Sequence, residues 1–273
     1  MAISNSFAAR RLDNWRAWSS ISAPTASSKC GRLRQRETSS LVVPVVFSLG
    51  TPFRIALRQE LTEDDVQPSF AAGLYAGPVE IASDGAAECV QVNFTPLGAY
   101  RFFGDAAAEL CSRMVDLESV LGPGVRRIRD RIAQTPSLAD RLELAERYIT
   151  VRLGYCPSSE IVHAYRAMAN SGGAIRIAKL AGEIGWSRKH FAQRFAAEIG
   201  LAPKTVARMM RFASACRLAR RQSCGGWADI AAEAGYADQS HLVREFTDLA
   251  GEPPLAWARR MALMDPKLAL EVR

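Results

Sequence analysis

A pattern of glycine, aromatic and helix-capping residues occurs twice near the end of this chain. The segment LAGEIGWSRKHFAQRFAAEIG (180–200) aligns with IAAEAGYADQSHLVREFTDLAG (230–251) once one extra residue, Ala237, is allowed in the second copy. Gly185 then aligns with Gly235, and the aromatic and histidine positions that follow align as well. The repeat constrains the fold strongly, because both copies are expected to form the same local structure.

Each copy predicts two helices joined by a tight turn. The first helix ends at the glycine, and the second begins at Ser187 in one copy and at Asp238 in the other, both good N-cap residues. A short helix, a glycine-containing turn and a second helix make up the helix-turn-helix layout. One such helical hairpin is common in ordinary α-helical proteins and is weak evidence for a helix-turn-helix. Two copies about 51 residues apart in a basic segment are strong evidence for it.

The second helix of each copy is predicted to have a buried and an exposed face. Phe191 and Phe195 mark the buried face in the first copy, and Leu242 and Phe246 mark it in the second. The side chains on the opposite face are mostly of types that hydrogen-bond to base edges in the major groove. They are Lys189 and Gln193, flanked by His190, Ala192 and Arg194, in the first copy, and Ser240 and Arg244, beside His241, in the second.

Between the copies, residues 203–221 predict one long helix that serves as a rigid spacer. Its apolar residues follow a three-to-four spacing along one face, and arginines crowd the remainder. A spacing of about one DNA turn, ~34 Å, would let both second helices enter successive major grooves. The arginines predicted to contact DNA phosphates are Arg188, Arg194, Arg208, Arg211 and Arg217.

The net charge of +7 is unevenly distributed along the chain. Residues 171–224 carry 11 basic and 2 acidic side chains, whereas residues 41–170 carry 12 basic and 16 acidic ones. A compact basic segment beside an acidic region favours a polyanionic partner, most often nucleic acid. A solvated basic face would give the same count, so charge alone leaves both interpretations open.

The rest of the chain predicts an α+β architecture. Residues 1–40 are expected to form a loosely ordered arm with a short helix near 12–18, and residues 41–95 a small antiparallel β domain, a cupin-like roll or a sandwich. Helices are expected at 105–114, 125–133, 138–152 and 158–169, and a Ser-Gly-Gly break precedes an all-α domain. The predicted units are the arm 1–40, an effector-sensing or dimerisation domain 41–170, a DNA-binding domain 171–264 and a tail 265–273.

Residues 175–260 resemble the DNA-binding domain of the AraC/XylS family of transcriptional regulators, a helical bundle with two helix-turn-helix units. The resemblance rests on LAGEIGWSRKHFAQRF, on GLAPKTVARMMRFASACRLA and on IAAEAGYADQSHLVREFTDLAGEPP, of which GYADQSHLVREF is the most diagnostic. A weaker resemblance to the N-terminal module of a subgroup covers VQVNFTPLGAYRFFG and ELCSRMVDLESVLG. Two departures are Lys189, where some members have an aromatic residue, and Ala192, which offers only a methyl group.

The resemblance implies a bacterial transcription factor that binds double-stranded DNA sequence-specifically, acts with RNA polymerase as an activator or repressor, and senses an effector, dimerises, or both. The base contacts that it implies are Lys189, Ala192, Gln193, Gln239, Ser240, His241 and Arg244. In the N-terminal domain, a small-molecule effector pocket is expected to involve aromatic residues, which in a β domain are more often simply core. The candidates are Phe53, Tyr75, Phe94 and Tyr100.

Other classes of protein fit the sequence less well. Residues 1–162 contain no histidine and the six cysteines form no C-x-x-C pair, so no catalytic residues, metal site or cofactor are expected, nor an enzyme fused to a DNA-binding tail. No apolar stretch approaches the ~20 residues of a membrane span, and a cytoplasmic protein with reduced thiols is expected. An adaptor that binds RNA polymerase with little DNA specificity of its own remains an alternative.

Overall fold

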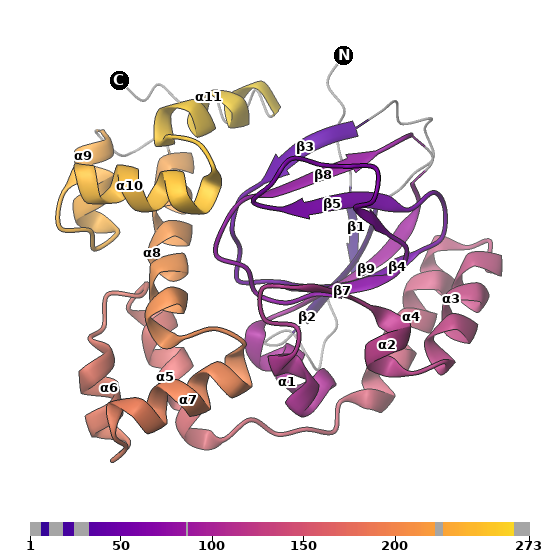
Figure 1. Ribbon diagram of the computed structural model, residues 1–273, viewed down its shortest axis with the longest axis horizontal. Coiled ribbons are helices and arrows are strands. Elements are labelled where there is room, and N and C mark those ends of the chain that lie inside the picture. The colour runs from indigo at the N-terminus through magenta and orange to yellow at the C-terminus, as the bar shows by residue number, and fades with distance from the viewer. Residues whose placement is uncertain (1–6, 11–18, 25–32, 86, 222–225, 265–273) are drawn as a thin grey trace.

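The computed structural model of the chain describes residues 7–10, 19–24, 33–85, 87–221 and 226–264. Within these residues, no helix is long and apolar enough to cross a membrane. The strands lie in the N-terminal part of the chain, and helices make up the C-terminal part (Figure 1). The predicted α+β class is therefore confirmed.

Two antiparallel sheets form the N-terminal part. The larger sheet has the strand order β1-β2-β9-β4-β7-β10, and the smaller has the order β3-β8-β5-β6. The strands are β1 (Phe7–Arg10), β2 (Ser19–Pro24), β3 (Leu33–Glu37), β4 (Val43–Ser48), β5 (Phe53–Leu57), β6 (Val66–Gln67), β7 (Phe70–Ala72), β8 (Val79–Ser83), β9 (Cys89–Phe94) and β10 (Met114–Asp116). The segment 41–95, which predicted an antiparallel β domain, contains β4 to β9.

The position of β4 in the larger sheet explains why the residues of this strand are apolar on both faces. It lies between β9 and β7, with Val45 opposite Val92 of β9 and Ala71 of β7. Because side chains alternate along a strand, Val46 packs with Ile55 between the two sheets, whereas Phe47 contacts the ring of Tyr148 on the other side. A strand covered on both faces reads as a continuous apolar run rather than an alternating one.

The helices follow the strands and continue to the end of the described residues. Several begin at capping side chains, such as Thr95, Asp116 and Ser137, which accept a hydrogen bond from a backbone N–H three residues ahead. The helices are α1 (Pro96–Phe103), the 3-10 helix η1 (Gly104–Ala108), α2 (Leu117–Leu121), α3 (Gly124–Gln134), α4 (Leu138–Arg152), α5 (Ser159–Asn170), α6 (Ile177–Glu183), α7 (Arg188–Ile199), α8 (Pro203–Arg220), α9 (Trp227–Glu233), α10 (Gln239–Ala250) and α11 (Pro254–Met264).

The structure differs from the sequence-based expectations at two places in the N-terminal half. The helix expected at 105–114 is replaced by α1, which starts earlier at Pro96 because Thr95 caps it, and by η1 and the start of β10. The loosely ordered arm expected at 1–40 contains β1, β2 and β3, which pair with the sheets. The helix expected near 12–18 lies outside the described residues.

The buried side chains form two cores that meet at α8. One core runs from Phe47 of β4 through α1, α4 and α5 to Phe195 of α7 and Met210 of α8. A second core joins the far side of α8, from Met209 onwards, to α9, α10 and α11. The first helix-turn-helix unit therefore shares a core with the β domain, whereas the second has its own.

Candidate nucleic-acid interface

Helices α6 and α7 form the first helix-turn-helix unit. Gly185, at φ +72°, provides the left-handed residue in the turn between them. The side chain of Ser187 then caps α7 by accepting a 3.2 Å hydrogen bond from the backbone N–H of His190. The turn and the cap thus fix the direction in which α7 leaves the turn.

Helices α9 and α10 repeat the same construction. Gly235 has φ +79°, and the Asp238 carboxylate accepts a 2.7 Å hydrogen bond from the backbone N–H of His241. The aromatic residue of each turn packs on the histidine of the following helix: Trp186 on His190 at 4.7 Å between ring centroids, and Tyr236 on His241 at 5.3 Å. The sequence repeat is therefore a structural repeat.

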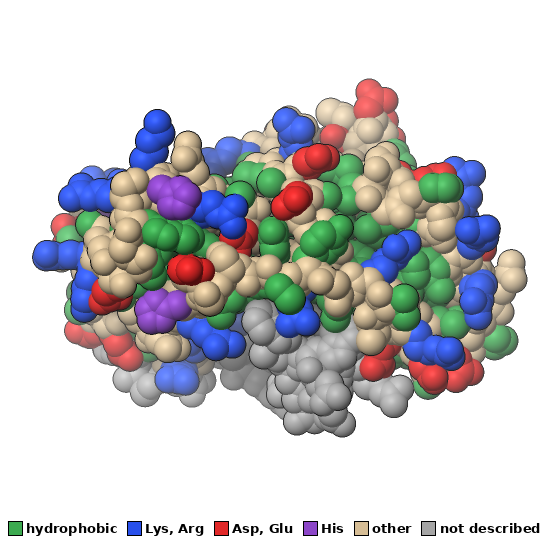
Figure 2. Space-filling model, turned by 90° about the horizontal axis from the view of Figure 1, so that it is seen from below, with side chains coloured by type: hydrophobic (Ala, Val, Ile, Leu, Met, Phe, Trp, Pro, Cys, Tyr) green, Lys and Arg blue, Asp and Glu red, His purple; other side chains and the backbone are tan. Residues whose placement is uncertain are grey.

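Helix α7 has the exposed face predicted from its periodicity. Phe191 and Phe195 are fully buried, whereas Lys189 and Gln193 are exposed and Ala192 is half-buried. The face of the molecule that includes this part is shown in Figure 2, where Lys and Arg side chains stand out towards the left-hand end. Two long polar side chains are thus free to reach a ligand from one helix face.

Helix α10 presents a similar face, with one exception. Gln239, Ser240 and Arg244 are exposed over the fully buried Leu242. His241 is only partly exposed, because its ring packs on Tyr236 and its Nε2 lies 3.4 Å from a carboxylate oxygen of Glu245. Of the candidate base-contacting residues on α10, His241 is therefore the least accessible.

Two of the five arginines predicted to contact phosphates have partners within the protein. The guanidinium of Arg208 donates to Glu245 at 3.0 Å and to Asp248 at 2.8 Å, both on α10. Arg211 donates to Glu245 at 3.2 Å and to the carbonyl of Gly173 at 3.1 Å, and its side chain is only 17% exposed. These arginines tie the spacer helix to α10 instead of facing solvent.

The remaining three predicted phosphate contacts differ in their partners. Arg188 and Arg217 are exposed, and Arg217 donates to the Ser214 hydroxyl at 3.1 Å. Arg194 is half-exposed but donates at 2.8 Å to Glu198, which is only 2% exposed. Glu198 also accepts a 2.7 Å bond from the backbone N–H of Ser158, so this carboxylate fastens the α4–α5 connection to α7.

The four aromatic residues predicted to line an effector pocket lie apart. Phe94 is core, stacked on Phe102 at 5.1 Å. Phe53 packs against the inter-sheet cluster, the Tyr75 hydroxyl accepts from Arg58 at 3.4 Å, and the Tyr100 hydroxyl donates to Asp105 at 3.4 Å. The structure therefore places these four side chains in packing and local contacts.

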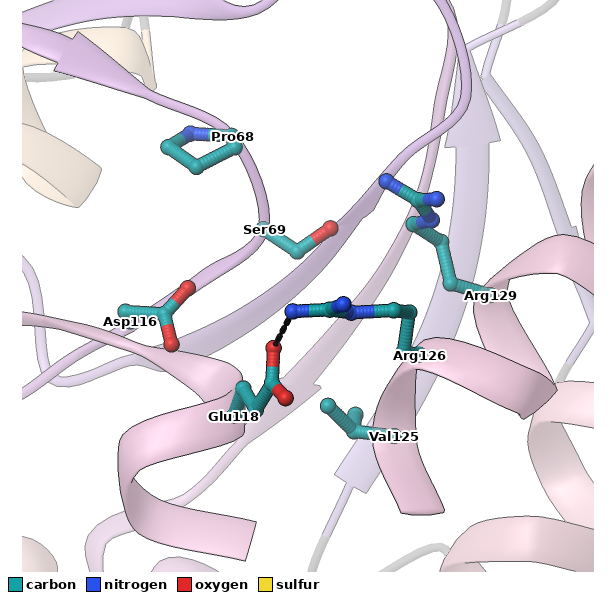
Figure 3. Close-up of a pocket in the computed structure, with 7 residues that line it drawn as sticks. All are labelled: Pro68, Ser69, Asp116, Glu118, Val125, Arg126 and Arg129. Atoms are coloured by element: carbon teal, nitrogen blue, oxygen red, sulfur yellow. Dashed lines mark hydrogen bonds and ion pairs between the residues drawn. The ribbon is translucent and has the colours of Figure 1, made fainter. Parts of the chain in front are cut away.

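A cavity that the sequence did not indicate lies between β10, α2 and α3 (Figure 3). It has a volume of about 380 Å³ and is lined by Pro68, Ser69, Asp116, Glu118, Val125, Arg126 and Arg129. Arg126 donates to Glu118 at 2.5 Å, and Arg129 projects into the same space from α3. The arginines of α3 are the one feature of the sequence that bears on this cavity, and they do not predict it, because such a run is equally typical of a solvated helix face.

Among the residues that the structure describes, no group of three or more histidine, cysteine or acidic side chains could hold a metal ion. His190 and His241 occupy the same position in the two units, but each packs on the aromatic residue of its own turn. Their shared position follows from the repeat.

The sequence profile of a helix-turn-helix domain family matches residues 180–260, which span both units. The C-terminal region is an AraC-type helix-turn-helix domain. The match supports a DNA-binding transcription regulator. None of the curated proteins matches the chain.

Solved structures with similarity to the chain include three transcription factors. The DNA-binding domain of AdpA, a global transcriptional factor in complex with a target DNA, is 22% identical and covers 40% of this chain and 99% of its own, with a TM-score of 0.37. ToxT from Vibrio cholerae O395 is 10% identical, covers 83% and 95%, and has a TM-score of 0.45. The AraC-like activator CuxR is 16% identical, covers 77% and 86%, and has a TM-score of 0.26. The assignment of the AraC-type domain rests on the family match and on the repeated geometry.

Proposed function

We propose that this protein binds specific sequences in double-stranded DNA, with α7 and α10 entering successive major grooves. The observation that carries the proposal is the repeated recognition surface: each second helix is capped at its start, is anchored by buried aromatic or aliphatic side chains, and exposes polar side chains on its opposite face. Side chains of these types read base edges in the major groove.

The proposed base contacts lie on both helices. Lys189 and Arg244 are suited to the O6 and N7 acceptors of guanine, and Gln193 is suited to adenine. For phosphate contacts we retain Arg188, near the start of α7, and Arg217 on α8; both are exposed. The full proposed base-contacting set is Lys189, Ala192, Gln193, Gln239, Ser240, His241 and Arg244.

We propose further that residues 171–264 act as the DNA-binding domain and residues 41–170 as a regulatory domain. Regulation would come from a small-molecule effector or from dimerisation, and the cavity lined by Arg126 and Arg129 together with Asp116 and Glu118 is the proposed place for a polar effector. RNA polymerase is the proposed partner at the promoter. The tail 265–273 has no proposed role.

Selection of bound duplexes from a randomised DNA library tests the proposal. We expect a consensus with two half-sites about one helical turn apart. Arg244→Ala should relax the base preference in one half-site only, and Gln193→Ala in the other. Recovery of unselected sequences, with equal affinity for all, would instead support an adaptor that contacts RNA polymerase.

A further inference from the structure

The N-terminal domain contacts the C-terminal end of α10 through several charged and backbone groups. Arg58, the residue after β5, donates to the Asp248 carboxylate at 2.8 Å and to the Asp248 carbonyl at 3.2 Å. Arg36 of β3 donates to the carbonyl of Gly251 at 3.2 Å, and the backbone N–H of Ser39 donates to the carbonyl of Leu249 at 3.0 Å. Carbonyls at a helix C-terminus lack partners within the helix, and here the β domain supplies the donors.

Arg58 is held in place from its own domain. Its backbone N–H donates to Pro78 at 3.0 Å, and its guanidinium donates to the carbonyl of Ala76 at 2.9 Å and to the Tyr75 hydroxyl at 3.4 Å. Its φ of +55° is left-handed, a conformation that costs free energy for a side chain other than glycine. Such strain persists only where surrounding contacts fix the backbone. The contacts within the β domain therefore determine the direction in which the Arg58 side chain extends towards α10.

The same carboxylate also binds the spacer helix. Asp248 accepts from Arg208 of α8 at 2.8 Å as well as from Arg58. Partial burial acts to raise the pKa of Asp248, but the hydrogen bonds from Arg58 and Arg208 outweigh it and lower that pKa. Asp248 therefore joins the recognition helix, the spacer and the β domain as a charged group.

The first recognition helix is held by the same domain on another side. Helix α7 packs against α1 and η1, and its Phe195 belongs to the core that continues into the β domain. The N-terminal part of the chain thus contacts α7 through α1 and η1, and the end of α10 through Arg36 and Arg58. The spacer α8 is not the only element that relates the two helices.

We propose that Arg58 is a positioning residue that sets the placement of α10 relative to α7, and thereby the half-site spacing that the protein accepts in DNA. This inference rests on the proposed function, because it presupposes that both helices enter the duplex. One added base pair moves the second half-site by about 3.4 Å and rotates it about the duplex axis, so a fixed pair of helices accepts one spacing. Loss of the Arg58–Asp248 contact weakens the attachment of α10 to the β domain, which Arg36 and Ser39 then maintain alone, and lets the protein accept neighbouring spacings.

The test is a series of duplexes that carry the selected half-sites with the spacing changed by one base pair in either direction. We expect the wild-type protein to discriminate against the altered spacings, and Arg58→Ala to reduce that discrimination by at least about fivefold, the lower end of usual coupling between sites. Binding to a duplex with a single half-site should not change. Arg58→Lys should restore part of the discrimination.

Arg54→Ala is the matched control, because Arg54 pairs with Glu63 and Asp84 inside the β domain and touches no recognition helix in the structure. In an Asp248→Ala background, Arg58→Ala should have a smaller further effect on spacing than in the wild type, because only the hydrogen bond to the backbone carbonyl of residue 248 is then left to lose. An equal loss from Arg54→Ala, or an unchanged spacing profile in folded Arg58→Ala protein, would overturn the proposal.

A second measurement needs no DNA. The backbone N–H of Ser39 is buried in a hydrogen bond to α10, so its hydrogen exchange reports docking of the two parts. Exchange at Ser39 should accelerate in Arg58→Ala and not in Arg54→Ala; unchanged exchange would refute the role of Arg58. If the wild-type protein selects no DNA sequence at all while Ser39 responds as expected, the proposed function fails and the docking contact stands.

Discussion

Truncation of Phe246 should unfold one helix-turn-helix unit without the other. The Phe246 side chain is fully buried, and its ring contacts Phe212 at 4.8 Å, Trp257 at 5.4 Å and Trp227 at 5.8 Å between centroids. Phe→Ala substitutions in cores cost about 3–5 kcal/mol, because transfer energy is lost and a cavity remains. With three large rigid rings around it, this site relaxes little, so we expect Phe246→Ala to cost about 4 kcal/mol.

The loss should be local, because Phe246 belongs to the core formed by α9, α10, α11 and one side of α8. Phe195→Ala is the matched substitution: Phe195 is also fully buried but lies in the core that α7 shares with α1 and the larger sheet. Its loss should therefore weaken both the first unit and the β domain.

Peptide-level hydrogen exchange, together with thermal unfolding, distinguishes the effects of Phe246→Ala and Phe195→Ala. We expect Phe246→Ala to lose protection in α9 to α11 and to keep it in α6, α7 and the sheets, whereas Phe195→Ala should lose protection in α7, α1 and η1 together. A uniform loss across the chain in both variants, or a cost below about 1 kcal/mol for Phe246→Ala, would refute the division into two cores.

Four further predictions concern individual side chains. Arg244→Ala should weaken binding to the selected DNA by about 1–3 kcal/mol in fluorescence anisotropy without changing the melting temperature. Arg211→Ala should instead lower the free energy of unfolding by about 1–3 kcal/mol in denaturant titration, because the Glu245 carboxylate loses one of its hydrogen-bond donors. Native protein at pH 8 should react with a thiol reagent at the exposed Cys156 and not at Cys216, whose pKa burial raises to about 12, as peptide mapping would show. Folding lowers the pKa of Asp248, so the charged carboxylate stabilises the protein at a pH above the ordinary Asp pKa of 3.8, and this stabilisation is lost as the pH falls below that value. The melting temperatures of wild type and Asp248→Asn should therefore differ near pH 6 and converge in acid.

The C-terminal half of the fold could be predicted from the sequence because its determinants are local. Gly185 and Gly235 have the left-handed backbone that their turns require, and Ser187 and Asp238 cap the helices that follow. The spacing of the buried phenylalanine in each copy fixes which face is exposed. Such signals lie within four residues of the structure that they specify.

The features that could not be predicted depend on contacts distant in the sequence. Arg208 and Arg211 read as solvated or phosphate-binding arginines, but Glu245, 37 and 34 residues away, binds both. Strands β1 to β3 lie in a Ser- and Arg-rich segment, where pairing with β8 and β9 decides the structure rather than apolar alternation. Arg58 and Asp248 are 190 residues apart, and no pattern in the sequence predicts their contact.

Fluorescence-anisotropy binding to DNA from upstream of the protein's own and neighbouring genes tests the central claim most directly. Random DNA serves as the competitor, and the titration is repeated at several salt concentrations. A sequence-specific regulator should retain one fragment over random sequence by ~10³-fold or more. Equal binding to every fragment, with a steep dependence on salt, would contradict the account and leave a protein that contacts only the phosphate backbone.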